Sequence, residues 1–213
     1  MTRKKVKILL LVVIILLIPF LIVLSNFKYK LYDDSFYSEE FTKNKVYEKV
    51  ADADNIMTDL LLFFKEKKEI TELPFTEDER SHLVDVKGVI NGFSVFLYIC
   101  YFLFFIILLI LFKLLKVDYK VIFNAIFLGA ILTIMTAFVF YLLSLNFSSS
   151  FVGFHQIFFP QGNWQFPSDS LLIQISPESL FYDFFYTVII NSLVSAFFLI
   201  LIWVMVFIYE KLS

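Results

Sequence analysis

The sequence contains only two histidines, His82 and His155, and imidazole is the side chain best suited to moving protons near neutral pH. Asp85 follows His82 by three residues, so the two would share one face of a helix. A neighbouring carboxylate can fix the tautomer of an imidazole or raise its pKa. These spacings make both histidines candidates for general acid and base catalysis, with Asp85 as an orienting carboxylate. A structural or solvated role for each histidine is the competing interpretation.

Other polar and aromatic residues near His155 could shape such a site. They are Asn163, Trp164, Asp169 and Glu178. A purely structural role would also account for each of them, so they are supporting candidates only.

Motifs for several other chemistries are missing from the sequence. It has no HExxH run and no His/Cys cluster, so we predict no metal site, and the lone Cys100 cannot form an internal disulfide. Phosphate-binding loops, a dinucleotide fingerprint and a GxSxG elbow are absent, and no basic patch favours nucleic acid. We therefore predict no cofactor, no nucleotide and no nucleic-acid partner.

The composition indicates a membrane protein. Of the 213 residues 60% are hydrophobic and 18% are charged, whereas soluble domains have roughly half and a quarter. Four stretches without Asp, Glu, Lys or Arg approach or exceed the roughly 20 residues that a helix needs to cross a bilayer. They cover residues 8–24, 89–112, 121–145 and 187–209. Because lipid cannot satisfy an irregular backbone, we predict an all-α membrane protein, with residues 1–213 forming a single polytopic domain of four transmembrane helices.

The first apolar stretch follows four basic residues and so resembles a signal peptide. Its length of about 17 residues exceeds the usual range of about 7–15 for the hydrophobic region of a signal peptide, and we expect a retained anchor rather than a cleaved leader. Basic residues favour the cytoplasm, and they also occur between spans two and three, at Lys113, Lys116 and Lys120. We therefore expect both termini inside, and residues 25–88 and 146–186 on the outer face of the cytoplasmic membrane, as a cap.

The first outer segment has two helix signals. Apolar residues recur at steps of three and four, which predicts one amphipathic helix; they are Val46, Val50, Ala53, Met57, Leu60 and Phe64. Further on, Thr76 and Glu79 form a capping-box pattern, which predicts a helix that starts there and continues into span two.

The second outer segment, residues 146–186, has no Lys or Arg and is rich in aromatic residues. Turn-like residues 160–163 separate two aromatic runs, so this part of the cap could form a short β-hairpin. Ser176, Pro177 and Glu178 then provide a helix start, which we expect to lead into span four.

Two blocks of sequence resemble a known family of four-span integral membrane proteins. Residues 74–87, PFTEDERSHLVDVK, resemble the segment before span two of that family. The runs HQIFF, GNWQFP and DSLLI, followed by Pro177 and Glu178, resemble its second outer loop. The family includes the lipoprotein intramolecular transacylase.

The resemblance implies an acyl transfer on lipoproteins whose amino-terminal cysteine bears a diacylglyceryl group. The sn-2 acyl chain would move to the α-amine of that cysteine and leave a lyso-form, with His82 and His155 as the catalytic pair. One would act as general base and the other as acid or oxyanion stabiliser. Since the unperturbed pKa of an α-amine is about 7.7–8.0, an imidazole can accept its proton. The implied partners are the lipoprotein substrate and membrane lipid.

Two other function classes fit the same sequence. One is an acyltransferase or hydrolase that uses the same histidines on another membrane lipid. The other is a non-enzymatic protein whose outer cap binds a partner. A channel is the least supported interpretation, because the spans lack ionisable residues that would line an ion pathway.

Overall fold

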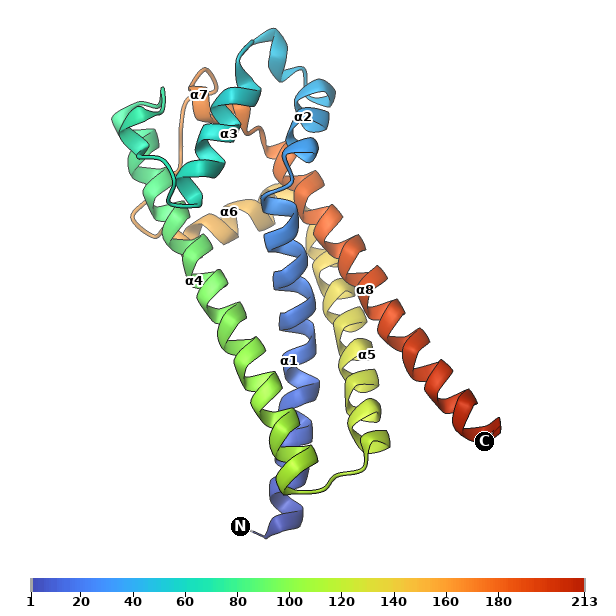
Figure 1. Cartoon of the computed structure of the whole chain (residues 1–213). Coiled ribbons are helices and arrows are strands. Elements are labelled where there is room, and N and C mark those ends of the chain that lie inside the picture. The colour runs from blue at the N-terminus through green and yellow to red at the C-terminus, as the bar shows by residue number, and fades with distance from the viewer. Residues whose placement is uncertain (1, 213) are drawn as a thin grey trace. The chain divides into compact units, whose positions relative to one another are not determined.

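The computed structural model describes residues 2–212, and the regular elements in that range are helical (Figure 1). The long helices are α1 (Arg3–Leu31), α4 (Glu77–Leu109), α5 (Tyr119–Ser144) and α8 (Glu178–Leu212). The shorter ones are α2 (Asp34–Lys43), α3 (Ala53–Phe64), α6 (Phe147–Phe158) and α7 (Leu171–Ile175). Val46–Glu48 and Ile70–Glu72 are 3-10 turns, and a π-helical turn at Ile110–Leu114 follows α4.

The chain divides into two compact units. The span unit comprises Met1–Lys28, Ser94–Leu142 and Val188–Ser213, and the cap unit comprises Tyr29–Phe93 and Leu143–Thr187. Each of the four long helices contains an apolar stretch long enough to cross a membrane. The prediction of four helical spans is therefore confirmed by length and composition.

The span unit has a narrow apolar core and an apolar exterior. Its core joins α1 residues such as Ile14 to Ile107 and the neighbouring Leu111, and to Ile122 of α5. Close packing at Gly129 is part of this core, because a Cβ there would lie 2.6 Å from the Cβ of Ile18. Many large side chains elsewhere on these helices are exposed, as expected for residues that face lipid.

The cap unit confirms the predicted start of α4. The backbone N–H of Thr76 donates to Glu79 Oε2 at 2.8 Å, and the N–H of Glu79 lies 3.4 Å from Thr76 Oγ1. Glu79 is 1% exposed, and its other oxygen accepts from the backbone N–H of Leu172 at 2.8 Å. One carboxylate therefore caps α4 and fixes it to α7, directly before the segment that bears His82.

The predicted amphipathic helix is shorter than its apolar stripe. Helix α3 begins at Ala53, with Asp52 at the N-cap position that aspartate favours, and Val46 belongs to a separate turn. Five of the six stripe residues are nevertheless buried, namely Val46, Ala53, Met57, Leu60 and Phe64. The preceding helix α2 was not predicted; it buries Phe36, Tyr37 and Phe41.

The short β-hairpin is a wrong prediction for the described residues. Residues 147–158 form helix α6 instead. The aromatic residues Phe147, Phe151, Phe154 and Phe158 are spaced by four, three and four, which places them on one side of a helix. That helical period outweighed the weak alternation on which the hairpin rested.

Candidate functional site

The cap unit brings the two histidines together from distant parts of the sequence. His82 lies on α4 and His155 on α6, and the side chains are only 6% and 8% exposed. Their ring centroids are 6.1 Å apart, and the ring planes differ by 26°. Two side chains that can accept and donate protons therefore lie next to each other in a largely buried place.

Aromatic rings surround this pair. Phe159 packs on both imidazoles, with centroids 4.8 Å from His82 and 5.5 Å from His155. Phe166 lies 5.7 Å from His82, and Trp164 lies 4.8 Å from His155. These rings exclude water, so charge that forms on either imidazole interacts more strongly with neighbouring charges than it would in solvent.

A hydrogen bond within α6 identifies the reactive nitrogen of His155. Nδ1 lies 2.8 Å from the backbone carbonyl oxygen of Phe151. A carbonyl oxygen can only accept, so Nδ1 carries the proton in this bond. The neutral ring then has its lone pair on Nε2, which is the nitrogen that can accept a proton from a substrate.

The environment favours the neutral form of both imidazoles. Burial lowers the pKa of His82 to about 4, and repulsion from His155 adds to this, while Asp85 and Asn163 oppose it. Burial also lowers the pKa of His155, against the effect of the Phe151 carbonyl. Both rings are therefore uncharged, and able to accept protons, at neutral pH.

Asp85 contacts the loop after α6 rather than the imidazole. Its Oδ2 accepts hydrogen bonds from Asn163 Nδ2 at 2.7 Å and from Gln161 Nε2 at 2.8 Å. Asn163 Nδ2 also lies 3.5 Å from the hydroxyl oxygen of Ser81. The predicted orienting carboxylate is thus near His82, but the structure shows its hydrogen bonds going to two amides.

The remaining supporting candidates divide into two groups. Trp164 and Asn163 lie at the histidine pair, as described above. Asp169 is exposed, and its backbone oxygen accepts from Gln174. Glu178 accepts a hydrogen bond from the Ser148 hydroxyl. Neither of these two acids has a described contact with a histidine.

Several residues at the site were not singled out from the sequence. Phe151, Phe159 and Phe166 supply most of the rings around the histidines, and Gln161 holds Asp85. The aromatic richness of residues 146–186 was the available signal for the rings. No sequence signal distinguishes Gln161 from the other glutamines.

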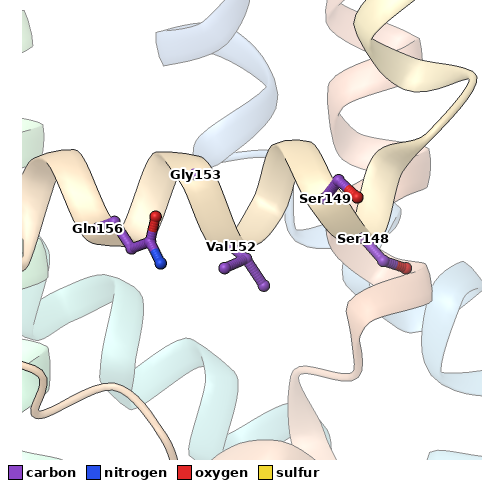
Figure 2. A pocket seen from close by; sticks show the side chains of 5 residues that line it. All are labelled: Ser148, Ser149, Val152, Gly153 and Gln156. Carbon is purple, nitrogen blue, oxygen red and sulfur yellow. The ribbon is translucent and has the colours of Figure 1, made fainter.

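An open pocket lies along a different face of α6. It is lined by Ser148, Ser149, Val152, Gly153 and Gln156 (Figure 2). A Cβ at Gly153 would meet no atom within 4 Å, so packing does not require glycine there. Within residues 2–212, no group of three or more His, Cys, Asp or Glu side chains could hold a metal ion.

A family model described as lipoprotein intramolecular transacylase Lit matches residues 7–182. No curated protein matches.

Among solved structures, the integral membrane lipoprotein intramolecular transacylase Lit from Bacillus cereus is similar, with 20% identity and a TM-score of 0.86. The match covers 99% of this chain and 100% of that one. Two further structures of the Bacillus cereus protein, with one histidine changed to alanine or to arginine, each match at 19% identity and a TM-score of 0.82. They cover 99% of this chain and 98% and 96% of theirs. At these identities the structural matches show a shared fold.

Proposed function

Because this chain belongs to the lipoprotein intramolecular transacylase family of integral membrane acyltransferases, we propose that it moves the sn-2 acyl chain of a diacylglyceryl-modified lipoprotein. The acceptor is the α-amine of the lipoprotein's own amino-terminal cysteine, and the product is the lyso-form. We place residues 25–88 and 146–186, which carry both histidines, on the outer face of the cytoplasmic membrane, with both termini inside. The distribution of basic residues supports this orientation.

The observation that carries the proposal is the buried pair of imidazoles, whose ring centroids are 6.1 Å apart in surroundings that lower both pKa values. Near neutral pH the α-amine is largely an ammonium. On the way to an amide its nitrogen must lose two protons, while the departing sn-2 oxygen gains one, and the other proton goes to solvent. Such a reaction needs proton acceptors first, and both rings are uncharged when it begins.

We assign the first proton transfer to His155, because Phe151 holds its Nδ1–H and leaves Nε2 free. The free amine then attacks the sn-2 carbonyl carbon, and a tetrahedral intermediate forms. As the C–O bond breaks, the His155 imidazolium returns its proton to the sn-2 oxygen, and His82 accepts the second proton from the nitrogen and later releases it to solvent. Repulsion between the rings disfavours two imidazolium ions at once, so the second uptake is coupled to this return.

The aromatic surroundings suit a reaction whose difficulty is geometric. The amine and the ester belong to one flexible lipid and must close a ring of medium size in the transition state. Holding them in an attack geometry contributes up to about 7–11 kcal/mol. Rigid rings such as Phe159 and Trp164 can provide that confinement beside the imidazoles.

The test is expression in a host whose lipoproteins remain diacylated, with wild type, His82→Ala and His155→Ala compared. The transfer leaves the mass of the lipopeptide unchanged, so fragment spectra and labelling of the free α-amine must locate the acyl chain. Each alanine variant should lower the rate of transfer by about 10²–10⁴-fold, the usual contribution of acid–base catalysis. Gln156→Ala is the matched control, because it is exposed and adjacent to His155.

Two results would contradict this proposal in different ways. If the alanine variants acylate the α-amine as well as wild type does, the histidine mechanism is wrong. If wild type leaves the amine free in a competent host, the substrate is wrong. Release of free fatty acid in that case would identify a hydrolase.

A further inference from the structure

We propose that Asn163 is the positioning residue for His82, and that Asp85 acts on this imidazole through Asn163. The inference rests on the proposed function, because it assigns a role within the same site. It differs from the direct Asp85–His82 pair that the sequence spacing suggests.

The Asn163 amide has a fixed orientation. Its Nδ2 donates to Asp85 Oδ2 at 2.7 Å, and a carboxylate accepts without donating. The same nitrogen lies 3.5 Å from Ser81 Oγ. The side-chain amide of Asn163 therefore contacts α4 close to His82. Its bond to Asp85 fixes which of the two positions on the amide the oxygen occupies.

Two buried polar atoms at this place have no partner. Nδ1 of His82 and Oδ1 of Asn163 are both inaccessible, and neither makes a hydrogen bond in the described structure. An unpaired buried polar atom is destabilising, because it has lost its hydrogen bonds to water and gained none in the protein. The two atoms are chemically complementary, because Nδ1–H can donate to an amide oxygen. Pairing them satisfies both, and catalytic hydrogen bonds are often long or misaligned before substrate binds.

The loop has the backbone needed to hold this arrangement. Gln161 also donates to Asp85 Oδ2, at 2.8 Å, so residues on both sides of Gly162 bind one carboxylate. Gly162 has a φ of +81°, a conformation that residues with a Cβ rarely adopt. Its N–H closes a turn on the Phe159 carbonyl at 3.1 Å. The turn brings the amides of residues 161 and 163 to the same side.

The chemical consequence is a matched pair of imidazoles. With Nδ1–H donated to Asn163, His82 presents Nε2 as its proton acceptor, as His155 does through its bond to Phe151. Asp85 then favours the protonated ring by polarising the amide, as a carboxylate does through a hydrogen-bond chain. Both rings are thereby set in the tautomer that a two-proton transfer requires.

The experiment uses full-length protein with ¹⁵N-labelled histidine. Because the chain has two histidines, its NMR spectrum contains two imidazoles, and His155→Gln assigns them. At neutral pH, wild type should show His82 as the Nδ1–H tautomer. Asn163→Ala should shift His82 toward the Nε2–H tautomer and lower the transfer rate at least about tenfold. Gln165→Ala, an exposed amide in the same loop, should leave the tautomer unchanged.

A pair of variants at Asp85 separates orientation from charge. Asp85→Asn keeps one oxygen that can accept from both amides, whereas Asp85→Ala removes it. We expect Asp85→Asn to keep the Nδ1–H tautomer of His82 and to retain more activity than Asp85→Ala, which should lose both. An unchanged His82 tautomer in both variants would mean that Asp85 acts by its charge without orienting Asn163, and would overturn the inference.

An unchanged His82 tautomer in Asn163→Ala would also overturn it. These spectra need no lipoprotein substrate, so they separate this inference from the proposed function. A tautomer change in a protein without transacylase activity would reject the proposed function and leave Asn163 as the orienting residue.

Discussion

The two units treat buried polar groups in different ways. In the span unit, the hydroxyls of Thr133 and Ser192 are buried and donate to carbonyl oxygens four residues earlier on their own helices, at 2.9 and 2.7 Å. In the cap unit, Arg80 Nε, His82 Nδ1 and Asn163 Oδ1 are buried and have no hydrogen-bond partner among the described residues. Polar groups in lipid must find their partners within the protein, whereas the cap unit leaves these three polar atoms unsatisfied, close together in the chain or in space.

Aromatic residues show the same contrast. Phe102 and Phe105 of the span unit are 65% and 58% exposed, as expected for rings that contact lipid. Phe159 of the cap unit is 2% exposed and packs on both histidines. Phenylalanine is therefore abundant for two reasons, and among the described residues only the cap unit combines buried phenylalanine rings with unpaired buried polar atoms. Such local exceptions to good packing are typical of functional sites.

The largest change in stability is expected for a substitution of Glu79. This substitution tests whether the stability of the cap unit depends on one buried carboxylate. Glu79→Ala removes the acceptor for Thr76 and Leu172 and leaves their backbone N–H groups unpaired. We expect a loss of about 3 kcal/mol. Unfolding should be followed by Trp164 fluorescence in a Trp203→Phe background, which reports on the cap unit alone. Glu77→Ala is the control, since that acid is exposed on the same turn; an equal loss there would show that the buried bonds contribute little.

The stability of the cap unit should also depend on pH, by a smaller amount than the loss expected for Glu79→Ala. The pKa of His82 is about 4 in the folded protein and about 6.5 in the unfolded chain. The contribution of neutral His82 to the free energy of unfolding is complete above pH 6.5 and is lost as the pH falls toward 4, because between these values only the unfolded state protonates this imidazole.

His82→Gln should remove this contribution, which we estimate at about 2 kcal/mol after allowing for partial solvation. The measurement is the difference between the wild-type and His82→Gln stability curves, by Trp164 fluorescence. Carboxyl groups titrate in both proteins and cancel. A difference that does not change with pH would mean that the folded ring does not resist protonation.

In the span unit, Gly129→Ala should separate α1 from α5. The new Cβ would lie 2.6 Å from Ile18 Cβ, and overpacking of this kind costs about 1–3 kcal/mol. The helical preference of alanine returns up to about 1 kcal/mol, so a net loss of about 1–2 kcal/mol should appear in detergent unfolding followed by circular dichroism. Adding Ile18→Ala should recover part of the contact strain. Gly92→Ala, with no atom within 4 Å, should be neutral or stabilising.

The smallest effect is expected at the bond between Asn124 and Trp203. The indole Nε1–H donates to Asn124 Oδ1 at 2.8 Å. Hydrogen bonds between membrane helices contribute about 0.6 kcal/mol on average, so Asn124→Leu should lower stability by about that amount with little change in transfer activity. The same unfolding assay measures it, with Asn91→Leu as the control. A loss as large as that at Glu79 would erase the contrast between the units.

Much of the fold could be predicted because its signals are local in sequence. Four charge-free stretches predicted four helices, and the Thr76–Glu79 pattern predicted where α4 begins. The weak alternation around residues 160–163 was misleading, because the four- and three-residue spacing of Phe147, Phe151 and Phe154 already favoured a helix. Local periodicity determines such elements when it is read at the right period.

The sequence alone also predicted outer segments for both histidines, and it placed Asp85 on the same helix face as His82. Only the tertiary structure decided that α4 and α6 place the imidazoles 6.1 Å apart, and that Asp85 binds Asn163 and Gln161. The physical reason is that helix spacing fixes neighbours within about one turn, whereas a contact between distant segments depends on how the helices pack. A catalytic site built from two distant segments can therefore be recognised only in the tertiary structure.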